Sequence, residues 1–92
     1  MEREKAYLLG KGWRLSRQDG LVKTFKFESF NESIKFTNAV ALKAEESEHH
    51  PDIIISYDKV TIKCITHDTG GITWKDLHLA LDCMNIYNSM LD

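Results

Sequence analysis

Two helix-start signals set the layout of this chain. Ser29 with Glu32, and Thr73 with Asp76, each place a hydroxyl side chain three residues before an acid. This is the capping-box pattern, in which the hydroxyl and the acid satisfy free amides at a helix N-terminus. The sequence therefore predicts one helix that begins near residue 29 and another that begins near residue 73, with elements of other types between them.

Turn signals in front of each helix predict two β-hairpins. Asp19–Gly20 lies between apolar stretches at residues 13–15 and 21–27, and this dipeptide is a strong hairpin signal. A second turn connects residues 53–57 to 60–65. Alternating apolar positions in the later strand of each hairpin indicate that one face is buried. The side chains expected on the buried faces are Phe25, Phe27, Val60, Ile62 and Cys64.

The helical segments complete the order helix, two strands, helix, two strands, helix. Residues 2–11 are expected to form a short helix ended by Gly10 and Gly12. The helix from residue 29 should end near Glu48, because Pro51 disfavours helical dihedrals at the preceding residue. Its main apolar stripe is expected to pack on the sheet and consists of Phe30, Ile34, Thr37 and Ala41, flanked by Phe36, Val40 and Ala44.

Length and composition exclude several classes of protein. The 92 residues suit a single domain, residues 1–92. A net charge of −2 with scattered Lys and Arg argues against direct contact with nucleic acid. The longest aliphatic run, Ile53–Ile55, is far below the roughly 20 apolar residues of a membrane span, and the N-terminus lacks a secretion signal. We therefore expect a cytoplasmic protein whose Cys64 and Cys83 are reduced and buried.

The last helix, predicted to run from residue 73 to about Met90, is apolar on two opposite faces. One face carries Leu77, Leu81, Met84, Asn88 and Leu91, and the other carries Leu79, Cys83, Ile86 and Met90. A small monomer is expected to hide only one of them, so the second should meet another subunit in a homo-oligomer. The alternative is that the second stripe lies under the N-terminal segment.

Five chemically active residues fall where predicted elements end: Glu45, His49, His50, His67 and Asp76. If the second helix reaches His49, Glu45 sits one turn before it and can fix its tautomer. Two imidazoles can share the acid and base roles that a reversible dehydration needs, with neither metal nor bound cofactor. Zinc is the rival hypothesis, but the histidines show no recognised zinc spacing.

The same residues resemble the signature of the pterin-4a-carbinolamine dehydratases. The likeness rests on the acid-rich segment Glu45–Pro51, then Tyr57, His67 and Asp76, and extends over nearly the whole chain. It implies an α+β fold, a four-stranded antiparallel sheet with three helices on one face, assembled into dimers or tetramers. The implied reaction converts a 4a-hydroxytetrahydropterin to quinonoid dihydropterin and water, which recycles tetrahydrobiopterin.

The resemblance also implies roles for individual residues. His49 and His67 look like the acid–base pair, and Glu45 and Asp76 like supporting carboxylates. The histidine at position 50 looks like a substrate-binding or assisting group. The other pterin-binding positions that the resemblance implies are Pro51, Thr66, Asp68 and Thr69. Many relatives carry an aromatic residue where this chain has Ile53, so a weaker pterin contact is expected there.

Each functional interpretation has a structural alternative. His49 and His50 could merely interact favourably with the negative C-terminal end of a helix dipole, and Asp76 could merely cap the last helix. The function itself also has an alternative, because animal relatives of this family act as dimerisation partners of a homeodomain transcription factor. A binding module of that kind would use the helical surface and need no catalysis.

Overall fold

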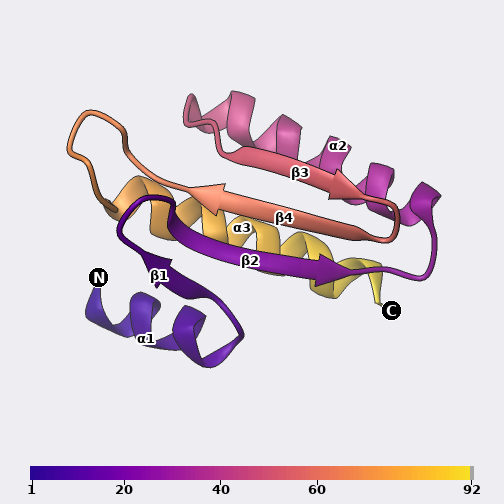
Figure 1. The fold of residues 1–92 in the computed structure, drawn as a ribbon, viewed down its shortest axis with the longest axis horizontal. Helices are drawn as coiled ribbons and strands as arrows, with labels where there is room; N and C mark the ends of the chain where they lie inside the picture. Colours follow the sequence, from indigo (N-terminus) through magenta and orange to yellow (C-terminus); the bar gives the residue numbers. More distant parts are fainter. Residues whose placement is uncertain (92) are drawn as a thin grey trace.

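The computed structural model describes residues 1–91 and shows the predicted α+β fold. Three helices cover one face of a four-stranded antiparallel sheet of order β1-β2-β4-β3 (Figure 1). The elements along the chain are α1 (Glu2–Gly10), β1 (Arg14–Ser16), β2 (Gly20–Lys26), α2 (Phe30–Ser47), β3 (Asp52–Ser56), β4 (Lys59–Cys64) and α3 (Trp74–Met90).

Both predicted capping signals begin a helix. The Ser29 hydroxyl accepts a hydrogen bond from the Glu32 amide at 3.1 Å, in front of α2. At the start of α3, the Thr73 hydroxyl accepts from the Lys75 amide, and Asp76 Oδ2 accepts from the Thr73 amide at 2.9 Å. These bonds satisfy amides that have no partner inside the helix, which is why both helices start where the sequence indicates.

The core forms between the helices and one face of the sheet. Leu21 pairs with Cys64 and Phe25 pairs with Val60 across β2 and β4, so all four side chains point to the same side. The helix residue Phe36 packs against Phe25 at a ring separation of 4.7 Å. All of the residues predicted for the buried strand faces are indeed buried.

The two cysteines are free and buried, as expected. Burial raises the pKa of the Cys83 thiol to about 12, and it raises the pKa of the Cys64 thiol as well. Both side chains therefore act as small apolar groups of the core.

The main apolar stripe predicted for α2 is wrong, whereas the residues predicted to flank it, Phe36, Val40 and Ala44, are buried. The buried residues are Ser33, Phe36, Val40 and Ala44, whereas Phe30 is 50% exposed and Ala41 is exposed. Phe36 contacts both Phe25 and Phe27, and these aromatic contacts set the side of the helix that faces the sheet. Ser33 tolerates burial because its hydroxyl donates to the Ser29 carbonyl.

The expectation that a small monomer hides only one apolar face of α3 is also wrong. The helix lies between α1 and α2 on the sheet (Figure 1), and residues of both predicted faces are buried within the monomer. Leu77 and Met84 on one face, and Leu79 and Cys83 on the other, are each less than a tenth exposed. Ile86 and Met90 are partly buried against the same core. Self-association stays a prediction, but the two apolar faces of α3 no longer support it.

Across residues 1–91, none of the helices combines the length and the apolar character needed to cross a bilayer.

Candidate functional site

The three predicted histidines His49, His50 and His67 line one cavity of about 350 Å³. The first two follow the C-terminus of α2, and the third follows β4, so two distant parts of the chain converge there. The remaining lining residues are Glu48, Ile65, Thr66, Asp68 and Lys75. Thr66 and Asp68, two of the predicted pterin-binding positions, therefore line the same cavity as His67.

His49 is held by the buried carboxylate of Asp76. Its Nε2 lies 2.5 Å from Asp76 Oδ1, the imidazole is 13% exposed, and the Asp76 side chain is fully buried. An ionised carboxylate only accepts hydrogen bonds, so Nε2 carries the proton of this contact and Nδ1 keeps a free lone pair in the neutral ring. The pairing fixes both the orientation and the tautomer of His49.

The two carboxylate oxygens of Asp76 have different hydrogen-bond partners. Oδ1 meets His49, while Oδ2 accepts from the Thr73 amide and, at 2.6 Å, from the Thr66 hydroxyl. The Thr73 hydroxyl lies 2.8 Å from the Thr66 oxygen and must be the donor there, because the Thr66 proton is used on Asp76. Asp76 is therefore a helix cap, as one of the two sequence interpretations proposed, and it is also the partner of His49, a role that was expected from the sequence for Glu45.

Glu45 pairs with His50 rather than with His49. Its Oε2 lies 2.7 Å from His50 Nε2, and both side chains are well exposed. The expected contact one helical turn away fails because α2 ends at Ser47 and Glu48 adopts a left-handed conformation with φ of 53°. The helical spacing is lost at that point, so His49 turns toward Asp76.

The backbone conformation of Glu48 terminates α2 and sets the direction of the chain toward His49. The amide of Glu48 bonds to the carbonyls of Ala44 and Glu45, and the His49 amide bonds to the Ala44 carbonyl at 3.1 Å. These contacts form the usual αL termination of a helix, a position that normally favours glycine. A glutamate here costs about 1 kcal/mol in backbone strain, and its side chain lines the cavity.

His67 stands on a tight turn between β4 and α3. Thr66 and Gly71 form an isolated antiparallel bridge, and the amides of Thr69 and Gly70 both bond to the Thr66 carbonyl. Gly70 has φ of 69°, the conformation that closes such a turn most easily with glycine. The turn places His67 in the wall of the cavity that His49 and His50 also line.

Some predicted positions lie away from the cavity walls. The Thr69 hydroxyl donates to the Thr66 carbonyl within the turn, and Pro51 is half-buried; neither residue is among those that line the cavity. Tyr57 belongs to the β3–β4 turn at the other end of the sheet, and Ile53 packs against the core.

Sequence reasoning missed Lys75, Glu48 and Ile65 as lining residues. The first could have been found, because a side chain in the first turn of α3 is held close to the capping residues Thr73 and Asp76. Glu48 and Ile65 are directly adjacent in sequence to predicted site residues, His49 and Thr66.

In residues 1–91, no three side chains of histidine, cysteine, aspartate or glutamate lie close enough together to hold a metal ion. The adjacent histidines form hydrogen bonds with different carboxylates, which directs their rings to separate partners.

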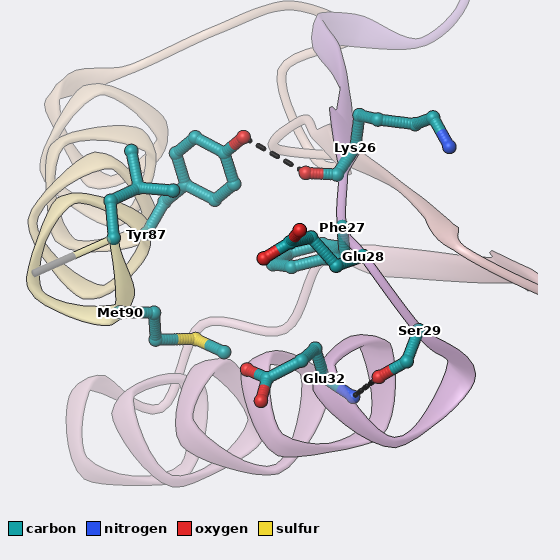
Figure 2. A pocket seen from close by; sticks show the side chains of 8 residues that line it. Lys26, Phe27, Glu28, Ser29, Glu32, Tyr87 and Met90 are labelled. Carbon is teal, nitrogen blue, oxygen red and sulfur yellow. Dashed lines mark hydrogen bonds between the residues drawn. The ribbon is translucent and has the colours of Figure 1, made fainter.

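A larger hollow, of about 530 Å³, lies at the opposite end of the sheet (Figure 2). Phe27, Tyr87 and Met90 contribute apolar surface, and Glu28 and Glu32 place carboxylates beside it. The Tyr87 hydroxyl donates to the Lys26 carbonyl at 2.9 Å and ties α3 to the end of β2. None of the described residues around it is a histidine.

Comparisons with known proteins match most of this chain to one family. The family profile of pterin 4 alpha carbinolamine dehydratase matches residues 1–86. A protein of Gloeobacter violaceus, provisionally named pterin-4-alpha-carbinolamine dehydratase 2, is 46% identical over 71 residues, which cover 74% of this chain and 77% of the relative. A protein of Thermosynechococcus vestitus with the same provisional activity is 45% identical over 75 residues, which cover 82% and 78% of the two chains.

The fold is matched by a crystal structure as well. The transcriptional coactivator/pterin dehydratase from Brucella melitensis has a TM-score of 0.81 and 29% sequence identity to this chain. The alignment covers 95% of this chain and 96% of that one. Profile, relatives and fold agree over most of the sequence, so the chain belongs to the pterin-4-alpha-carbinolamine dehydratase family.

Proposed function

We propose that this protein dehydrates a 4a-hydroxytetrahydropterin to quinonoid dihydropterin by histidine acid–base catalysis. The observation that carries the proposal is the convergence of His49, His50 and His67 on one cavity, with His49 held by the buried Asp76. The family membership supplies the substrate class, and the cavity supplies groups of the type that the reaction needs.

The reaction requires one proton donor and one proton acceptor on neighbouring atoms of the pterin. The bond between C4a and the hydroxyl oxygen breaks, and the hydroxyl leaves as water after it takes a proton from an imidazolium. The second imidazole removes the proton of N5, and the electrons of the N5–H bond form the C4a–N5 double bond. Proton exchange with water then returns both imidazoles to their starting states.

In this proposal His49 is the base and His67 is the acid. Asp76 supports the first role, because a buried carboxylate on Nε2 stabilises the imidazolium that forms when Nδ1 takes a proton. The exposed position of His67 supports the second role, since an imidazole in contact with solvent can exchange its proton with water after each turnover. His50, paired with the exposed Glu45, assists by binding the substrate.

The decisive experiment is a dehydration assay on purified wild-type protein and single alanine variants. His49→Ala and His67→Ala should each lower kcat by about 10² to 10⁴-fold, the usual contribution of a positioned acid or base. Asn85→Ala, an exposed change on α3, is the matched control and should retain wild-type turnover. Turnover that survives in both histidine variants would remove these residues from the mechanism.

The alternative function is a binding module that acts on transcription. The Brucella melitensis relative is named both a coactivator and a dehydratase, which is the observation that favours it. The same assay separates the two, because a binding module has no dehydration activity in the wild type.

The wider cellular role follows from the proposed chemistry. An enzyme of this kind would act in the cytoplasm and recycle tetrahydrobiopterin for aromatic amino acid hydroxylases.

Self-association into a dimer or tetramer is also part of the proposal. Ile54 and Ile55 are both exposed on the edge strand β3, where they point to opposite faces of the sheet and offer apolar contacts for it, whereas the opposite stripes of α3 are used within the monomer. Sedimentation velocity would measure the oligomeric state.

A further inference from the structure

A second hollow, of about 250 Å³, lies next to the histidine cavity and shares part of its wall. The two hollows share His49 and Lys75 as wall residues. The other residues around the second hollow are Ser47, Trp74, His78, Leu79 and Asp82. Neither the acid–base mechanism nor the capping of α3 uses Trp74, His78 or Asp82.

The exposure of Trp74 at this hollow requires an explanation. It lies in the first turn of α3, is 54% exposed, and meets the ring of His78 edge-on at 5.2 Å. An exposed tryptophan beside a hollow provides a large apolar contact surface at low cost in side-chain entropy. The remaining walls are mixed, with Leu79 apolar and Ser47 and Asp82 polar.

Pterin chemistry connects the two hollows. The reacting atoms are C4a and N5, and the next ring atom after N5 is C6, which carries the variable side chain of natural pterins. A pterin whose C4a–N5 bond faces His49 therefore directs its C6 substituent past that same histidine. A hollow that shares His49 with the histidine cavity is where this substituent can go.

We propose that the second hollow is a subsite for the C6 substituent, and that it selects pterins whose side chain is short and hydroxylated. The inference rests on the proposed dehydratase function. Trp74 and Leu79 contact the carbon chain, while Asp82, Ser47 and His78 provide hydrogen-bond partners for its hydroxyls. An anionic tail fits less well, because the single cation Lys75 is offset by Asp82.

The test compares two substrates that differ only at C6, the carbinolamines of tetrahydrobiopterin and of 6-methyltetrahydropterin. In the wild type, KM should be about fivefold lower for the hydroxylated substrate, as expected for one or two added contacts. Trp74→Ala and Asp82→Ala should each bring the two KM values to within about twofold of one another, because each removes a contact to the C6 substituent. Asn85→Ala, on the same helix and outside both hollows, should preserve the fivefold difference.

Tryptophan fluorescence gives a second measurement that does not depend on turnover. Trp74 is exposed and Trp13 is only 3% exposed, so a ligand in the subsite should change the Trp74 emission. Stable 7,8-dihydrobiopterin should produce a larger change than 6-methyl-7,8-dihydropterin. The Trp74→Phe variant reports the Trp13 background and should respond equally to both ligands.

Two outcomes would overturn the inference, and they are distinguishable. Turnover of both substrates with the same KM ratio in the wild type and in both variants rejects the subsite and leaves the dehydratase function standing. Absence of turnover with either substrate in the wild type rejects the dehydratase function, and the subsite with it.

Discussion

Two neighbouring histidines in this protein have carboxylate partners in opposite environments. The His49–Asp76 pair is 13% and 0% exposed, whereas the His50–Glu45 pair is 62% and 75% exposed. The two nitrogen–oxygen distances, 2.5 Å and 2.7 Å, are nearly the same. Burial, rather than contact distance, should therefore decide which pair matters, because water screens an exposed pair and leaves a buried one strong.

The comparison also separates the functions that each carboxylate can serve. Asp76 has three hydrogen-bond donors around it and belongs to a helix cap, so its removal leaves buried groups without partners. Glu45 has one partner in this site and projects from an exposed helix end. The first pair is thus part of the fold and of the site, and the second is part of the surface.

The largest effect is expected for Asp76→Ala. This change leaves the Thr73 amide and the Thr66 hydroxyl without their acceptor and opens a void at the start of α3. Loss of the cap and of buried hydrogen bonds should lower the free energy of unfolding by about 2 to 4 kcal/mol. Urea denaturation followed by circular dichroism measures it, and a loss below about 1 kcal/mol would contradict the assigned role of burial.

Asp76→Asn sharpens the comparison by preserving the size of the side chain. The amide oxygen can still cap α3, but the amide group would donate to His49 and force the opposite tautomer. We expect a loss of kcat of about 10²-fold or more, with KM changed far less, because the tautomer matters to proton transfer and not to binding. Equal losses of activity in Asp76→Asn and Glu45→Gln would break the distinction between the two pairs.

Glu48→Gly tests the backbone that separates the two pairs. Glycine adopts the left-handed conformation at φ of 53° without strain, so the free energy of unfolding should rise by about 1 kcal/mol. Glu48→Asn is the matched control, since asparagine tolerates this conformation and keeps a polar side chain at the cavity wall. Destabilisation by glycine would show that the Glu48 side chain contributes more than the backbone strain costs.

The sequence predicted those parts of the molecule that depend on neighbours along the chain. Both helix starts, at Ser29 and Thr73, follow from side chains three residues apart, and both are present. The hairpins follow from local alternation and turn residues. These signals act within one turn or one strand, so a single sequence displays them completely.

The sequence predictions that the structure corrects concern contacts between different secondary-structure elements. The partner of His49 is Asp76, from another helix, rather than the helical neighbour Glu45, because the left-handed Glu48 interrupts the helical spacing. Likewise, the burial of both faces of α3 depends on the placement of α1 and α2 around it. Helical periodicity identifies an apolar face but not the element that covers it.

The smallest effect is expected for Glu45→Ala. The carboxylate of Glu45 is 75% exposed, and an exposed ion pair contributes little after solvent screening and side-chain entropy are taken into account. The free energy of unfolding should change by less than about 0.5 kcal/mol, and kcat should fall no more than about threefold, since His50 remains beside the cavity. High salt should reproduce most of this small change in the wild type while leaving the Asp76→Asn defect untouched, because salt screens exposed charges far more than buried ones. A large effect of Glu45→Ala at low salt would mean that exposure does not rank the two carboxylates, and that His50 has a more direct role in the chemistry than substrate binding.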